Sequence, residues 1–145
     1  MKRSSPLLRL ATLLYVVAWF LPVIKDGTTL AQGGLPGWEA FRVALAPLIS
    51  YGDFAKDTSI FHNVISVTSA LTNFLMLLCL YWFARADATP RVSQIRWLIV
   101  VAVAVDAYWF RMGTSLLLGY YCWLGSFVVL AIVSFRGLPQ IAPKE

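Results

Sequence analysis

Residues 64–84, VISVTSALTNFLMLLCLYWFA, contain no charged side chain. A helix of about 20 predominantly apolar residues crosses the ~30 Å hydrocarbon core of a bilayer, so this run predicts a complete membrane span. The composition of the whole chain agrees, because 59% of its 145 residues are hydrophobic and only 13% are charged. A soluble domain of this length needs more charge to cover its surface.

Three further apolar runs predict spans on either side of this one, at residues 7–24, 97–112 and 116–135. The expected fold class is an all-α membrane protein, a four-transmembrane-helix bundle in one domain covering residues 1–145. Residues 111–115 predict a tight turn between the last two helices, which then form an antiparallel hairpin. Residues 25–63 form an outer loop and residues 136–145 a loose tail. An alternative for the first run is a signal peptide cleaved after Ala31, although the run exceeds the usual ~7–15 apolar residues of such a peptide.

The Lys and Arg residues predict the orientation, because basic residues are retained on the cytoplasmic side of a membrane. They dominate the N-terminal segment, the link between the second and third runs, and the tail. The outer loop balances its basic residues with Asp26, Glu39, Asp53 and Asp57. We therefore expect a multi-pass protein of a bacterial inner (plasma) membrane with both termini cytoplasmic. Nucleic acid is not an expected partner, because the net charge of +5 forms no basic stripe.

Residues 37–49 of the outer loop, GWEAFRVALAPLI, have the spacing of an amphipathic helix. Its larger apolar residues recur at three- and four-residue steps: Trp38, Phe41, Leu45 and Leu48. Glu39 and Arg42 can pair on another face, and Pro47 is expected to end or kink the helix. The helix either seals the bundle at the outer leaflet or forms a lid or partner-binding surface. The candidate residues for that surface are Trp38, Glu39, Phe41 and Arg42.

Asp106 is the only acidic residue inside a predicted span. An ionisable group there is costly and usually faces a partner or water. Other runs supply polar groups at a similar depth, which predicts a polar cluster in the outer half of the bundle. Its members are His62, Asn63, Asp106, Arg111, Tyr120 and Tyr121. The cluster is either an outward-opening polar pocket or proton-accepting site, or a set of hydrogen bonds that only holds the helices together.

The sequence contains few residues that could act in catalysis or bind a metal ion. His62 is the only histidine, so no histidine pair can bind a metal or haem. Cys79 and Cys122 lie in different apolar runs and are expected to pack as small hydrophobic residues. The chain has no Gly-x-Ser-x-Gly elbow and no glycine-rich phosphate loop. These observations favour a non-enzymatic protein without a cofactor.

Three short motifs carry a resemblance: Gly-Trp-Glu-Ala-Phe at 37–41, Phe-His-Asn at 61–63, and Gly-Tyr-Tyr-Cys-Trp at 119–123. Together they resemble a broad group of small four-span bacterial inner-membrane proteins. That group carries a Gly-aromatic-Glu stretch in the first outer loop, Asn-Pro at the second span and Gly-Tyr-x-x-Trp in the last. Here Val64 follows Asn63 where the group has proline. The resemblance implies a fold and a location, and it implies no activity.

Two functions from different classes are expected. The first is a non-enzymatic small integral membrane protein that binds a protein or lipid partner through its extracytoplasmic face, as an accessory subunit or an immunity-type protein. The alternative is a transporter-like or proton-linked membrane protein that uses Asp106. In that case the chain is expected to form a homo-oligomer, because four short helices line only a narrow path.

Overall fold

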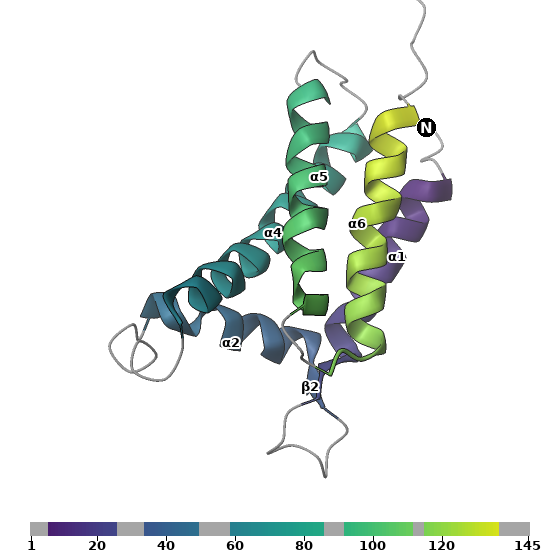
Figure 1. The fold of residues 1–145 in the computed structure, drawn as a ribbon. Helices are drawn as coiled ribbons and strands as arrows, with labels where there is room; N and C mark the ends of the chain where they lie inside the picture. Colours follow the sequence, from purple (N-terminus) through teal and green to yellow (C-terminus); the bar gives the residue numbers. More distant parts are fainter. Residues whose placement is uncertain (1–5, 26–33, 50–58, 86–91, 112–114, 137–145) are drawn as a thin grey trace, which may run out of the picture.

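The computed structural model describes residues 6–25, 34–49, 59–85, 92–111 and 115–136 (Figure 1). This part of the chain is mostly helical, which confirms the coarse fold class. The helices are α1 (Pro6–Phe20), α2 (Gly37–Ile49), α4 (Ile60–Arg85), α5 (Val92–Ala107), the 3-10 helix η2 (Tyr108–Arg111) and α6 (Leu118–Arg136). Two short strands, β1 (Pro22–Ile24) and β2 (Leu35–Pro36), pair antiparallel.

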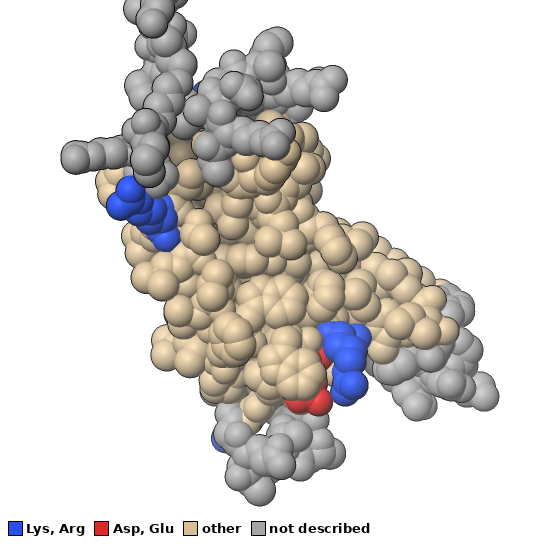
Figure 2. Space-filling model, turned by 180° about the vertical axis from the view of Figure 1, so that it is seen from behind, with Lys and Arg blue, Asp and Glu red and all other residues tan. Residues whose placement is uncertain are grey.

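Four of the helices, α1, α4, α5 and α6, run alternately in opposite directions (Figure 1). The starts of α1 and α5 and the ends of α4 and α6 therefore lie at one end of the bundle, and α2 crosses the other end. Residues Ile60–Phe83 and Leu118–Phe135 are long and apolar enough to cross a membrane, whereas α1 is apolar but only 15 residues long. Figure 2 shows a wide uncharged band between charged side chains near the two ends of the molecule.

The first apolar run, residues 7–24, is not one continuous helix, so the prediction of a helical span over all of these residues is wrong at its end. The helix α1 ends at Phe20, and Pro22 begins the strand β1. Proline lacks an N–H and disfavours the helical conformation of the residue before it, which accounts for the break. The end of this run instead pairs with β2, and Ile24 forms a bridge with Leu116.

The bounds of the other runs also differ from the prediction at the α2 end of the bundle. The helix α4 begins at Ile60 rather than at Val64, and α5 ends at Ala107 and continues as η2. The helix α6 begins at Leu118 rather than at 116, because the preceding residues hydrogen bond to the segment around β1. Residues 112–114 of the predicted turn, Ala31 and residues 137–145 of the tail lie outside the described residues.

The predicted amphipathic helix is confirmed with the same bounds, since α2 runs from Gly37 to Ile49. Pro47 does not end the helix, because this residue lies inside α2, which continues to Ile49. A proline this close to the C-terminal end removes only one intrahelical hydrogen bond. The helix rests on α4 and α1, and Ser66 Oγ of α4 donates a hydrogen bond to the Ala44 carbonyl oxygen at 3.5 Å.

The core of the bundle lies away from α2. Its buried side chains are Leu8, Tyr15, Met76, Cys79, Phe83, Ile95, Ile99, Ala102, Phe127 and Leu130. The closest helix pair is α1 and α6, where the small residues Ala11, Ala18 and Ser126 are almost completely buried. Small side chains let helix backbones approach closely, which replaces the hydrophobic driving force that is missing between helices in lipid. Cys79 is a buried free thiol in this core.

Candidate functional site

Asp106 lies at the end of α5, where its side chain is fully buried. Ser69 Oγ of α4 donates a hydrogen bond to Asp106 Oδ1 at 2.9 Å. The same Ser69 Oγ accepts a hydrogen bond from Trp109 Nε1 at 3.1 Å, and the Tyr120 hydroxyl of α6 donates to the main-chain carbonyl of Asp106. Asp106 Oδ2 is buried and has no hydrogen-bond partner among the described residues. Asp106 therefore links α5 to α4 through its carboxyl group and to α6 through its main-chain carbonyl, while Oδ2 accepts no hydrogen bond from the described residues.

A cavity of about 80 Å³ lies beside this network, between α1, α2, α4 and α6. Its lining residues are Ala18, Trp19, Val23, Ile24, Gly37, Ala40, Phe41, Ala44, Ser69, Ala70, Asn73, Trp109, Leu116, Tyr120 and Trp123. The small residues open the space and the aromatic rings form much of its wall. Ser69 therefore has two roles, because it is part of the cavity wall and its hydroxyl donates a hydrogen bond to the Asp106 carboxyl group.

The polar groups of the cavity wall are largely engaged with one another. Trp123 Nε1 donates to Asn73 Oδ1 at 3.1 Å, and Asn73 Nδ2 donates to the Ala70 carbonyl oxygen at 3.0 Å. The Tyr15 hydroxyl reaches the Asn73 carbonyl oxygen at 3.4 Å. A buried polar group that already has a hydrogen-bond partner has little remaining capacity to hydrogen bond to a ligand. The space therefore presents mainly aromatic and aliphatic surface.

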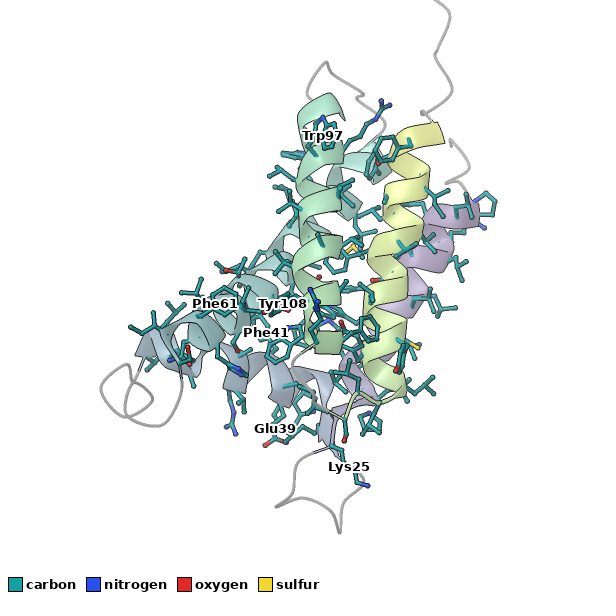
Figure 3. The ribbon with its side chains drawn as sticks, in the orientation of Figure 1. Lys25, Glu39, Phe41, Phe61, Trp97 and Tyr108 are labelled. Atoms are coloured by element: carbon teal, nitrogen blue, oxygen red, sulfur yellow. The ribbon has the colours of Figure 1, made fainter. Side chains whose placement is uncertain are left out.

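The helix α2 forms one wall of the cavity. Phe41 packs against Trp19, with ring centroids 5.3 Å apart, and against Phe74 at 5.9 Å. Trp38 is half exposed and Ile49 is 83% exposed, so the helix also presents apolar side chains away from the bundle. Figure 3 places Phe41 at the bundle, with Glu39 and Lys25 toward the outside.

The four candidate residues of α2 therefore divide between two surfaces. Phe41 belongs to the cavity, whereas Trp38, Glu39 and Arg42 lie outside its lining. Arg42 pairs with Glu39 at 3.5 Å, and the arginine side chain is 73% exposed. Exposed ion pairs contribute little to stability, about 0–1 kcal/mol. This pair is therefore available to a partner at small cost to the helix.

The structure brings together only part of the predicted polar cluster. Asp106 and Tyr120 are hydrogen-bonded, and His62 packs edge-on against Trp109, with ring centroids 5.5 Å apart. Asn63 is buried in the first turn of α4. Tyr121 is half exposed and packs against Phe110 at 6.0 Å. Arg111 ends η2 with an exposed side chain.

Several residues of the site were missed by the sequence reading, above all Ser69 and the tryptophans of the cavity wall. Ser69, Thr72 and Asn73 are all buried, and the last two lie three and four residues after Ser69, the spacing of one helix face. A polar stripe of this kind on an otherwise apolar helix is the signal that could have located the site. The tryptophans carried no such signal, because aromatic residues near the ends of spans are also typical of interfacial belts.

No family model, curated protein or solved structure matches this chain. Among the described residues, no group of three or more His, Cys, Asp or Glu side chains could hold a metal ion. The features available for function are an aromatic cavity, a buried carboxyl beside it and an exposed apolar surface on α2.

Proposed function

We propose that the chain is a small integral membrane protein that binds a protein or lipid partner through the face carrying α2, and that it is not an enzyme. In this proposal α1, α4, α5 and α6 all cross a bacterial inner membrane. The basic N-terminal segment, link and tail are then cytoplasmic, and α2 is extracytoplasmic. The alternating directions of the four helices support this threading, because the helix ends that border those three segments lie at one end of the bundle (Figure 1).

The observation that carries this proposal is the exposure of apolar side chains along α2. Phe41 closes the cavity, whereas Trp38, Val43, Leu48 and Ile49 of the same helix are exposed. An amphipathic helix at the end of a bundle with apolar side chains exposed is typical of a segment that contacts the lipid interface or a second protein. A role as an accessory subunit or an immunity-type protein fits such a surface.

The test is a double substitution, Trp38→Ala with Glu39→Ala, in cells whose partners are captured by crosslinking in native membranes and identified by mass spectrometry. We expect partner recovery to fall at least tenfold, because the central aromatic anchor of an interface typically contributes about 2 kcal/mol or more. Trp97→Ala is the matched control, since Trp97 is 67% exposed and lies at the opposite end of the bundle (Figure 3). Equal recovery from the double variant and from the wild type would remove the proposal.

The orientation of the chain in the membrane is tested by cysteine labelling. A membrane-impermeant maleimide is expected to label Glu39→Cys in intact cells, and to label Trp97→Cys only after lysis. Both measurements are made in a chain in which Cys79 and Cys122 are replaced by serine or alanine. Labelling of Trp97→Cys in intact cells, with Glu39→Cys protected, would invert the topology and place α2 in the cytoplasm.

A second function, transporter-like or proton-linked, is favoured by a different observation. Asp106 is fully buried, one of its oxygens is unpartnered within the described structure, and Ser69 connects it to the cavity. Ionisable groups at such positions in membrane proteins commonly mark ion or proton pathways. An oligomer would supply a wider path than one copy of the bundle.

The second function predicts proton flux in proteoliposomes that depends on Asp106. Asp106→Asn is expected to reduce the flux at least tenfold while preserving helix content, because the amide can still accept the Ser69 hydrogen bond but cannot exchange a proton. The flux is followed with an entrapped pH-sensitive dye, and circular dichroism reports the fold. A wild-type protein that conducts no more than empty vesicles would exclude this function.

A further inference from the structure

The size of the cavity and the nature of its wall restrict what it can bind. One water molecule needs on the order of 10–15 Å³ of such space. The 80 Å³ available therefore suits a small headgroup, since pockets for drug-sized ligands measure about 300–1,000 Å³. The wall contains five aromatic side chains: Trp19, Phe41, Trp109, Tyr120 and Trp123. They pack against one another and their neighbours, for example Tyr120 against Trp123 with ring centroids 5.9 Å apart, so the wall is preformed.

An anionic ligand does not fit this wall. No Lys, Arg or His is found among the lining residues that the structure describes. Of the three indole groups in the wall, those of Trp109 and Trp123 already donate their N–H groups to protein, to Ser69 and to Asn73. The wall therefore offers a ligand mainly carbon surface and the negative faces of aromatic rings, which attract apolar groups and cations.

The carboxyl group of Asp106 favours a cation over a neutral apolar ligand. It lies next to the cavity wall, because the lining residue Ser69 donates a hydrogen bond to Asp106 Oδ1 at 2.9 Å. Asp106 has no ion-pair partner among the described residues, and its Oδ2 atom is unpartnered. An isolated buried carboxylate is strongly unfavourable, and a positive charge nearby offsets that cost. A cation in the cavity would supply this charge, whereas a neutral apolar ligand would not.

The geometry points to a binding site for a small organic cation, an alkylammonium or quaternary ammonium group, in the cavity under α2. Such a group combines a positive charge with an apolar surface, and it is the ligand class that aromatic cages hold by cation–π attraction. This inference deepens the Asp106-centred function proposed above and rests on it. It names the ligand of that site, which the sequence did not suggest.

The test compares two probes of the same shape, choline and 3,3-dimethyl-1-butanol, of which only the first is charged. The full-length protein is purified in a maltoside detergent, which contains no ammonium group of its own. Binding is followed by calorimetry and by the fluorescence of the cavity tryptophans. We expect choline to bind at least tenfold more tightly than its neutral isostere. Equal affinity for the two probes, or no binding of choline, would overturn the inference.

Three variants separate charge from shape. Asp106→Asn is expected to bring choline affinity down to that of the neutral probe. Phe41→Leu removes one ring of the wall and is expected to weaken choline binding about fivefold. Phe61→Leu is the matched control, because Phe61 packs on Tyr108 with ring centroids 5.7 Å apart and does not line the cavity. An unchanged affinity in Phe41→Leu would contradict the site even if Asp106→Asn failed to fold.

Two further arms identify the source of the cation and separate this inference from proton transport. Preference for a short-chain phosphatidylcholine over the phosphatidylglycerol of equal chain length would assign the site to a lipid headgroup. Equal binding of both lipids, with choline still bound, would assign it to a free cation. Choline binding without proton flux upholds the inference and excludes proton transport. Proton flux without choline binding refutes the inference and leaves the proton-linked function standing.

Discussion

The Gly119→Ala substitution is expected to lower the free energy of unfolding by about 3 kcal/mol, the upper end of what overpacking usually costs. A Cβ atom at this position would lie 2.7 Å from the Leu21 carbonyl oxygen and 2.8 Å from that of Pro22. Both oxygens are backbone atoms, so the clash cannot be relieved by a change of side-chain rotamer. The segment is also anchored, because the Leu117 N–H donates to the Val23 carbonyl at 2.8 Å and the Lys25 N–H to the Ser115 carbonyl at 2.9 Å.

The matched control for Gly119→Ala is Gly125→Ala on the same helix. A Cβ atom at position 125 would meet only Leu14 Cδ1 at 3.9 Å, which is an ordinary contact. Alanine is favoured over glycine inside a helix by about 1 kcal/mol, so this variant is expected to be neutral or more stable. Chemical unfolding of both variants in detergent micelles measures the difference. Equal stabilities would show that the close contact between α6 and the β1 segment does not matter for folding.

The Gly37→Ala substitution is expected to release α2 from the bundle without unfolding the core. The added Cβ atom would collide with the Ala18 carbonyl oxygen and lie 2.9 Å from Trp19 Cα. It would also displace the Gly37 N–H from the Leu21 carbonyl oxygen, to which it donates at 3.1 Å. No residue of α2 belongs to the buried core cluster, so α1, α4, α5 and α6 keep their packing.

Hydrogen exchange of the main-chain amides measures this release. In Gly37→Ala the amides of residues 37–49 are expected to exchange about 30–100-fold faster, which corresponds to a local destabilisation of about 2–3 kcal/mol. The amides of α6 are expected to keep their wild-type rates. Val43→Ala serves as the control, because this exposed residue of α2 does not line the cavity. Faster exchange throughout the chain would mean that α2 is part of the global folding unit.

The helix α2 shows how far local sequence information reaches. The apolar spacing of residues 37–49 predicted the helix with the bounds that the structure has. The same periodicity could not predict that Phe41 turns toward Trp19 and the cavity while Trp38 stays half exposed. That division depends on where Gly37 meets α1, which is a contact between residues far apart in the chain.

The strand β1 shows where hydropathy fails. Residues 22–24 are as apolar as the helix before them, so the prediction extended the helix through them. Their conformation follows from Pro22 and from pairing with residues 35–36 and 116. Hydropathy measures the preference for an apolar surrounding and carries no information about hydrogen-bond partners.

Composition and hydropathy determined that this chain is helical and apolar enough for a membrane, and the position of Asp106 in an apolar run marked it as exceptional. These are local properties, because burial of apolar side chains and helical spacing depend on neighbours along the chain. Only the tertiary structure decided which groups meet Asp106, since Ser69 and Tyr120 come from other helices. The cavity beneath α2 likewise depends on the tertiary structure. It exists only because four helices and a short sheet leave a space lined by aromatic side chains where they meet.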